Sequence, residues 1–224
     1  MNEELIKKFE NYLRTPKGTL SSFRLDLSVN DAYRLLLAAY QGEVSEREQC
    51  FRSDAASLSA LSMIASALVN PSGKFGIILL GNVGNGKTTA LRALQKVINR
   101  LRIPDIRCAY RITHLSLPIY RASSLVEMWE QNPEKFRTTT SAPLLGIDEL
   151  GEENVDVRRY GNFASPICDL IYQRYDRRLF TAISTNLGAS SERGSIRERY
   201  GDRIADRLNE MMHKVVFKAH SFRT

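Results

Sequence analysis

Long apolar runs, cysteine clusters and a signal-like N-terminus are missing from this sequence. No stretch approaches the roughly 18 uninterrupted apolar residues of a membrane-spanning helix, so we expect no spanning helix and no membrane partner. The first residues are acidic and then basic, without an apolar signal core, which predicts a cytoplasmic protein. Cys50, Cys108 and Cys168 form no C-x-x-C pair, which argues against a disulfide framework or a zinc site, and we expect buried thiols.

Internal repeats and low-complexity segments are absent as well. The 224 residues are 43% hydrophobic and 25% charged, with both signs mixed, which indicates a globular domain with at most a small appendage and excludes a disordered chain. The net charge of +7 comes mainly from residues 90–140 and 156–224. This balance suits a polyanionic partner, nucleic acid first, although many proteins with a similar charge bind none.

The hydrophobic pattern differs between the first part of the chain and the rest. The first fifty residues read as short helices, including one at 31–40, and a longer helix is expected from Ser53 to Val69. From Phe75 onward, short apolar runs alternate with amphipathic stretches. The expected strands are 75–80, one or two within 106–121, 144–147, 179–184 and 214–218, and the expected helices are 88–100, 124–131, one around 167–175, and 192–211. Alternation of this kind predicts an α/β fold with a parallel sheet covered by helices.

The segment from Gly81 to Thr88 matches the phosphate-loop pattern G-x-x-x-x-G-K-[ST] in full. Its glycines let backbone N–H groups turn toward a phosphate, and the following helix offers its positive N-terminal end. Lys87 supplies a cation for the β- and γ-phosphates, and the Thr88 hydroxyl is placed to ligate Mg²⁺. We expect ATP with Mg²⁺ at this loop. The expected nucleotide-binding residues are Gly81, Asn82, Val83, Gly84, Asn85, Gly86, Lys87, Thr88 and Thr89.

A second apolar strand, 144–147, runs into Asp148 and Glu149. Asp148 would hold Mg²⁺, and Glu149 would orient or deprotonate the attacking water. Neighbouring residues of an extended strand point to opposite faces, so we expect the chain to leave the sheet here, where both carboxylates can reach the site. The second carboxylate favours attack by water over transfer to a bound acceptor.

Two further features have an ordinary and a functional interpretation. Asn186 ends the strand at 179–184 and could contact the γ-phosphate or the water, or simply form a turn. Arg199, Arg203 and Arg207 are spaced four apart and would form one stripe on a helix. The stripe is either a solvated face paired with neighbouring acidic residues or an arginine presented to a phosphate, including one held by a neighbouring subunit.

These elements in this order resemble the AAA+ ATPases, and more closely the DnaC/IstB-like helicase-loader and transposition-helper family. The resemblance covers about residues 53–224. Its Walker A motif is 81–88, its Walker B motif is 144–149, and its sensor-1 residue falls on Asn186. Its box VII pattern, G-[DE]-R-h-x-[DE]-R, falls on 201–207, and its closing S-[YF]-R segment falls on 221–223.

The resemblance implies a P-loop three-layer sandwich with a central parallel sheet. It divides the chain into a helical N-terminal segment, 1–52, and an AAA+ ATPase domain, 53–224, with no separate C-terminal lid domain. Arg207 looks like the trans-acting arginine finger, Arg203 its support, and Arg223 the sensor-2 residue. The expected catalytic set is Lys87, Glu149, Asn186, Arg203, Arg207 and Arg223.

The function implied is that of an ATP-hydrolysing protein similar to replication helicase loaders. It would assemble with ATP into a homo-oligomer and act on single-stranded DNA or on a DNA-bound helicase or transposase. The alternatives are an IstB-like transposition helper, a small-molecule P-loop kinase and a non-catalytic ATP-binding module. The candidate DNA contacts, which ordinary helix-surface charges would also explain, are Arg158, Arg159, Arg174, Arg177 and Arg178.

Overall fold

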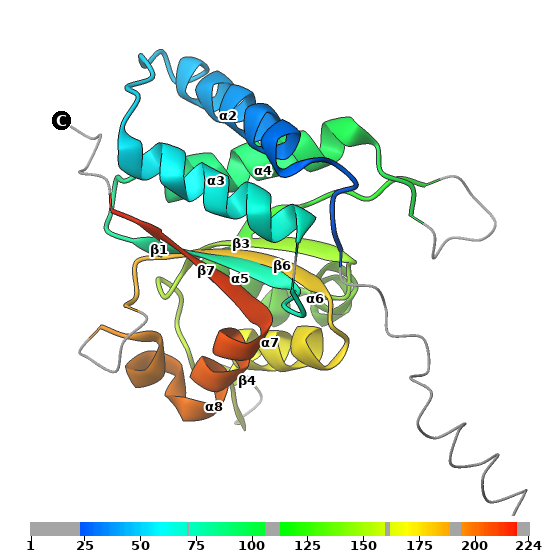
Figure 1. Cartoon of the computed structure of the whole chain (residues 1–224). Helices are drawn as coiled ribbons and strands as arrows, with labels where there is room; N and C mark the ends of the chain where they lie inside the picture. Colours follow the sequence, from blue (N-terminus) through cyan, green and yellow to red (C-terminus); the bar gives the residue numbers. More distant parts are fainter. Residues whose placement is uncertain (1–22, 71, 106–112, 160–161, 189–193, 219–224) are drawn as a thin grey trace, which may run out of the picture.

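Five parallel strands form the centre of the molecule in this computed structural model, which describes residues 23–70, 72–105, 113–159, 162–188 and 194–218 (Figure 1). The strand order is β2-β3-β6-β1-β7. The strands are β1 Gly76–Gly81, β2 Ile119–Arg121, β3 Leu144–Leu150, β6 Phe180–Thr185 and β7 Met212–Phe217. Because β6 pairs with both β1 and β3, the ends of three strands distant in sequence lie side by side.

Helices cover both faces of this sheet (Figure 1). On one face lie α2 Val29–Ser45, α3 Ala55–Val69 and α4 Lys87–Leu101. On the other lie α5 Ala122–Gln131, α6 Pro133–Thr140, α7 Pro166–Asp176 and α8 Ile196–Met211. A small antiparallel hairpin joins β4 Val157–Arg159 to β5 Asn162–Ala164. The expected α/β three-layer sandwich is thus confirmed.

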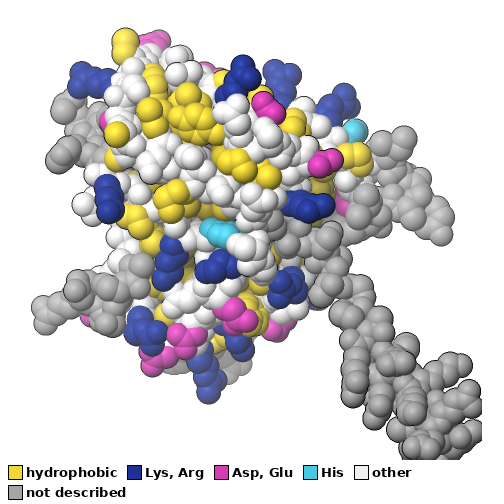
Figure 2. All heavy atoms as spheres, in the orientation of Figure 1, with side chains coloured by type: hydrophobic (Ala, Val, Ile, Leu, Met, Phe, Trp, Pro, Cys, Tyr) yellow, Lys and Arg dark blue, Asp and Glu magenta, His cyan; other side chains and the backbone are white. Residues whose placement is uncertain are grey.

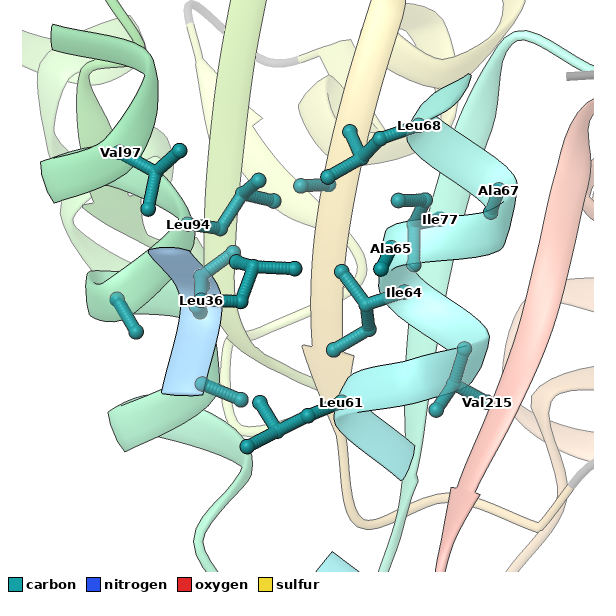
Figure 3. Packing of buried hydrophobic residues seen from close by; sticks show 14 of the residues in the cluster. Leu36, Leu61, Ile64, Ala65, Ala67, Leu68, Ile77, Leu94, Val97 and Val215 are labelled. Carbon is teal, nitrogen blue, oxygen red and sulfur yellow. The ribbon is translucent and has the colours of Figure 1, made fainter. Parts of the chain in front are cut away.

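The sheet separates two hydrophobic clusters because the side chains of a strand alternate in direction. Ile77 of β1 packs with the α2, α3 and α4 cluster, whereas Ile78 packs with the α5, α7 and α8 cluster. Figure 3 shows the first cluster, in which Leu36, Ile64 and Leu94 come from three different helices. Each such buried side chain contributes about 1.5–3 kcal/mol of apolar burial. Among the described residues, no helix is both long and apolar enough to cross a bilayer.

The helix α2 lies before residue 52 in sequence but packs into the same hydrophobic core as the helices that follow it. Leu36 of α2 is fully buried, in the same cluster as α3 and α4. Ser28 caps α2 by accepting a hydrogen bond from Asp31 N, and Asp54 caps α3 by accepting one from Ser57 N. The division of the chain at residues 52 and 53 stays a prediction.

Several local expectations differ from the structure. The helix expected at 124–131 ends at Gln131 as predicted, with Asn132 as its C-cap. The helix α6 directly after it was not predicted; Asn132 also caps it, and Pro133 occupies its first turn. The hairpin of β4 and β5 was not foreseen, since strands of three residues carry no clear periodicity. A strand at 106–112 lies outside the described residues.

The expectation of buried cysteines is wrong for Cys50, and Cys168 is only partly buried. Cys50 is exposed because it lies on the connection between α2 and α3, residues 46–54, which runs along a cavity instead of through the core. Burial raises the pKa of Cys168 to about 11. Cys108 lies outside the described residues.

Candidate functional site

The phosphate loop joins β1 to α4 and lines a cavity of about 530 Å³. A volume of this size suits a small-molecule ligand. Gly86 caps α4 in the left-handed conformation, with φ of 92°, and a Cβ there would lie 2.2 Å from Tyr40 Oη. Glycine is therefore required at this position for both its conformation and its lack of a side chain. The first turn of α4 follows directly, so its N–H groups and positive helix end favour an anion.

Lys87 is held inside the loop by the loop's own oxygen atoms. Its Nζ donates hydrogen bonds of 2.7 Å to Gly81 O, 2.7 Å to Asn82 O and 3.1 Å to Asn85 Oδ1. Asn85 in turn donates a buried hydrogen bond of 2.8 Å to Phe217 O, which ties the loop to β7. The loop is thus organised by contacts within one chain, with its cation in place.

Asp148 lies behind Thr88 at the carboxyl end of β3. The Thr88 hydroxyl donates a hydrogen bond of 3.0 Å to Asp148 Oδ1, and the Ser184 hydroxyl donates to the same oxygen. Asp148 is 6% exposed. Hydroxyl and carboxylate oxygens are the donors that Mg²⁺ prefers, so this pair fits a magnesium site. The sequence did not predict that Ser184 would lie here. The feature that could have indicated it is a polar side chain near the end of a buried strand.

The expected strand end at residue 147 is wrong, because β3 continues to Leu150. Its register against β6 shifts between Ile147 and Leu150, and Glu149 has a φ of 59°. This bulge breaks the alternation of side chains, so that Glu149 lines the cavity while Asp148 stays behind it. Left-handed backbone at a non-glycine residue is strained, and Glu149 N donates 3.0 Å to Ser184 Oγ at this point.

Two polar side chains at the same edge contact acidic neighbours. Arg121, at the end of β2, places Nε 3.3 Å from Glu149 Oε2. Asn186, just past β6, lines the cavity, and its Nδ2 donates a long hydrogen bond of 3.4 Å to Glu152 Oε1. Arg121 was not identified from the sequence, because nothing local indicated that β2 pairs with β3 in this register.

The opposite wall of the cavity comes from α2 and from the connection between α2 and α3. Tyr40, Val44 and Phe51 provide its apolar surface, and the rings of Tyr40 and Phe51 meet edge to face at 6.0 Å. Arg47 Nη1 donates a hydrogen bond of 3.2 Å to Thr89 Oγ1. The sequence indicated only the segment just before the helix expected from Ser53 as a place to look for adenine contacts. It did not single out these residues, because they belong to no nucleotide-binding motif.

The arginines of α8 do not form the single stripe that their spacing predicted. Gly201 interrupts the helix with φ of 83° and ψ of 170°, so Arg199 lies on the other side of a kink from Arg203. Arg199 donates to Glu153 O, and the Tyr200 hydroxyl donates to the buried Glu153 carboxylate. The first half of α8 is thereby joined to the loop that follows β3.

Arg207 rests on the surface of its own chain. Its guanidinium lies 4.3 Å from the ring centroid of Tyr175, and Nη1 lies 4.0 Å from Glu210 Oε2. Neither Arg203 nor Arg207 lines the cavity. Figure 2 shows basic and acidic side chains intermixed over the region of α8. Arg223 lies outside the described residues.

One of the candidate DNA contacts is wrong. Arg174 is fully buried and donates hydrogen bonds to Thr140 O, Ala142 O, Phe180 O and Thr181 Oγ1. Burial lowers the pKa of Arg174 to about 9, so the group stays charged at neutral pH. It faces inward because it supplies donors to carbonyl groups where α6 ends and β6 begins. Arg158, Arg177 and Arg178 are exposed, and the side chain of Arg159 lies outside the described residues.

Comparisons with known proteins bear on the fold. No family profile and no curated protein matches the sequence. The chain is similar to a crystal structure of the DnaC helicase loader, with 22% identity and a TM-score of 0.55 over 75% of this chain and 93% of that chain. A crystal structure of DnaI has 15% identity and a TM-score of 0.56 over 81% of this chain and 94% of that chain.

The replication initiator DnaA bound to AMPPCP and single-stranded DNA has 14% identity and a TM-score of 0.52 over 76% of this chain and 49% of that chain. This chain therefore spans about half the length of that DnaA chain. These likenesses show that the chain shares the fold of these proteins, and the α/β three-layer fold is the one that the resemblance to the DnaC/IstB-like family implied.

Proposed function

We propose that this chain binds ATP in the cavity and hydrolyses it. The observation that carries the proposal is the meeting at one cavity of the loop holding Lys87, the Thr88–Asp148 oxygen pair and Glu149. These parts supply a phosphate cradle, a site for a divalent cation and a carboxylate for water activation. Phosphoryl transfer requires mainly positioning and charge stabilisation, so these parts suit the reaction.

The β- and γ-phosphates would accept hydrogen bonds from the loop N–H groups and from Lys87 Nζ. A phosphate oxygen is a stronger acceptor for an ammonium than a neutral carbonyl, so ATP would replace the contacts of Lys87 with Gly81 and Asn82. Thr88 and Asp148 would hold Mg²⁺. When bound, this ion neutralises charge on the phosphate oxygens.

Glu149 is assigned to the attacking water. It would accept the water proton as the water oxygen bonds to the γ-phosphorus and the bond to the β-bridging oxygen breaks, with ADP leaving with the electron pair. Arg121 Nε lies 3.3 Å from the same carboxylate, so Arg121 and the water would compete for its oxygen atoms. Asn186, at the end of β6, would hold the γ-phosphate or the water.

Arg203 and Arg207 would complete the site of a neighbouring subunit. Both lie outside their own cavity, so they can reach ATP only in an oligomer. An arginine supplied in trans stabilises charge in the transition state, which would make ATP turnover depend on assembly. Arg223 is proposed as a sensor-2 residue on the family resemblance alone.

The partner is proposed from the neighbours in fold. DnaC is named as a helicase loader, and the DnaA structure holds AMPPCP and single-stranded DNA. We propose a similar function for this chain. It would assemble in the presence of ATP and act on single-stranded DNA or on a DNA-bound helicase. A transposition helper of the IstB-like type, with a transposase as partner, is the second candidate, because it shares every motif quoted above.

Nucleotide binding is the first test. Lys87→Ala should weaken MgATP binding about 100-fold or more, measured by titration calorimetry, because it removes the loop cation. Lys96→Ala is the matched control, since this half-buried lysine lies on the same helix outside the cavity lining and pairs with Glu43 and Glu46. Tight binding retained by Lys87→Ala would contradict the loop assignment.

Turnover and partner binding distinguish the alternatives. Release of phosphate from ATP without another substrate is expected, and it should rise with protein concentration. A phosphorylated metabolite found by mass spectrometry would instead indicate a kinase, and intact binding without turnover would indicate a non-catalytic module. Salt-dependent binding to single-stranded DNA, with and without ATP, tests the nucleic-acid partner.

A further inference from the structure

We propose that Arg47 is a second phosphate-binding cation of the cavity, contacting a phosphate that ATP and ADP share. This inference rests on the proposed function, because it requires a nucleotide in the cavity. It adds a residue that belongs to neither Walker motif, carried by the connection between α2 and α3.

Arg47 already reaches the first turn of α4. Its Nη1 donates a hydrogen bond of 3.2 Å to Thr89 Oγ1, and Thr89 is the third residue of that helix. The N–H groups of this turn are the donors that a phosphate chain meets at a helix N-terminus. A guanidinium has five N–H donors in a rigid plane, and the contact with Thr89 occupies one of them. The remaining donors are near the place where phosphate oxygens would lie.

The position of Arg47 selects which phosphate it meets. The water-activating carboxylate, Glu149, lies on β3 and marks the γ-phosphate end of the cavity. Arg47 is joined instead to α4 and comes from the wall that carries Tyr40 and Phe51. A phosphate contacted from this wall is one nearer the nucleoside, which ADP also possesses. Arg47 therefore strengthens ATP and ADP binding equally and leaves the chemical step unaffected.

The charges of the residues in this wall also support phosphate binding by Arg47. Arg47 and Arg52 both line the cavity, while Glu46, Glu48 and Asp54 of the same connection do not. The acidic residue among the lining side chains is Glu149, which is paired with Arg121. Among the described residues that line the cavity, this wall contributes two cations and no carboxylate, with Asp54 within electrostatic range of Tyr40. A polyphosphate would supply charge opposite to that of the two arginines.

Cys50 provides a reporter for this wall. It is exposed, lines the same cavity and stands between Arg47 and Arg52 in sequence. A nucleotide held against the connection by Arg47 would cover the thiol. Cys50 belongs to neither Walker motif, so the rate at which its thiol is labelled reports whether a bound nucleotide lies against this connection.

The first experiment measures the affinity of Arg47→Ala and Arg47→Lys for MgATP and MgADP. Loss of a charge-assisted hydrogen bond should weaken both nucleotides by about tenfold, with kcat at saturating ATP unchanged and with partial recovery in Arg47→Lys. Arg34→Ala, an exposed arginine of α2 paired with Asp31, is the matched control. Unchanged affinity in Arg47→Ala, beside the loss caused by Lys87→Ala, overturns the inference and leaves the proposed function intact.

The second experiment follows maleimide labelling of Cys50 in a Cys108→Ser, Cys168→Ser background. MgADP should slow the labelling several-fold, and Arg47→Ala should move the protection to higher MgADP concentration. Labelling that MgADP does not slow, at concentrations that saturate the loop, overturns the inference. If the unsubstituted protein binds neither nucleotide, the proposed function fails and the inference fails with it.

Discussion

The cavity and the arginine-bearing helix α8 are organised in opposite ways. In the cavity, each functional side chain is fixed by atoms of the same chain: Lys87 by loop oxygens, and Thr88 and Ser184 by Asp148. On α8, Arg207 rests on an exposed surface against Tyr175 and Glu210. The side chains of the first region are held by contacts within the chain, whereas Arg207 lies on the surface outside the cavity.

We infer from this difference that nucleotide binding depends on one chain and that catalysis depends on a second. The loop is already ordered by folding, so phosphate binding would require little beyond exchanging the contacts of Lys87 with Gly81 and Asn82 for contacts with phosphate oxygens. A trans-acting arginine contributes only when a second copy docks, so its effect depends on protein concentration. We therefore expect one chain to bind ATP well and to hydrolyse it slowly, with the rate rising on assembly.

The largest effect is expected from substituting Arg207, which should change ATP turnover without changing ATP binding. Arg207→Ala should lower the ATP turnover of the assembled protein by about 1000-fold and leave MgATP affinity unchanged, because an arginine finger acts on the transition state. The measurement is turnover against protein concentration, together with calorimetric binding.

Mixing provides the control for that prediction. Arg207→Ala has an intact cavity and Lys87→Ala has an intact arginine, so combining the two should restore turnover at their shared interfaces. Turnover per chain that is independent of concentration, and unaffected by Arg207→Ala, rules out the trans mechanism.

The next largest effect concerns the stability contributed by the buried residue Arg174, which precedes Tyr175 in α7. Arg174→Leu should lower the free energy of unfolding by about 3 kcal/mol, because it leaves buried carbonyl groups at Thr140 and Phe180 without their donors. Arg177→Leu is the matched control, since its guanidinium is exposed and makes a 3.3 Å contact with Ser141 Oγ. Denaturant unfolding of both variants measures the difference, and equal stability of the two contradicts the role given to Arg174.

A smaller effect tests whether Tyr175 orients Arg207. Tyr175→Leu should reduce assembled turnover by a few-fold, because an exposed cation–π contact contributes about 0.5–1 kcal/mol. Tyr175→Phe keeps the ring but loses the hydrogen bond of 2.5 Å to Glu210 Oε2, so it should retain most of the activity. Equal losses in the two variants would assign the effect to the hydroxyl instead of the ring.

The smallest effect is expected from substituting Arg121, whose side chain contacts Glu149 in the cavity. Arg121→Ala removes the partner of Glu149, and an exposed ion pair contributes at most about 1 kcal/mol, so turnover by the unassembled protein should rise by no more than about fivefold. Single-turnover hydrolysis with ATP limiting measures the change. A fall in rate would mean that Arg121 helps Glu149 and does not restrain it.

The sequence predicted the parts of the site that are contiguous in the chain. The phosphate loop, the buried strand before it and the helix after it depend on local patterns, and the structure has all three. The bulge at Glu149 and the kink at Gly201 were not predicted, because each depends on a neighbouring element: β6 for the bulge and the loop after β3 for the kink.

By itself, the sequence determined the α/β fold, the phosphate loop and the two carboxylates near the end of β3, because hydrophobic period and glycine placement act over a few residues. Only the tertiary structure decided that Ser184 joins Asp148, that Arg121 meets Glu149 and that Arg47 lines the cavity. These contacts depend on the strand order β2-β3-β6-β1-β7 and on the packing of α2 against α4, which bring together residues far apart in the chain. Local sequence patterns do not determine which of these distant residues come into contact.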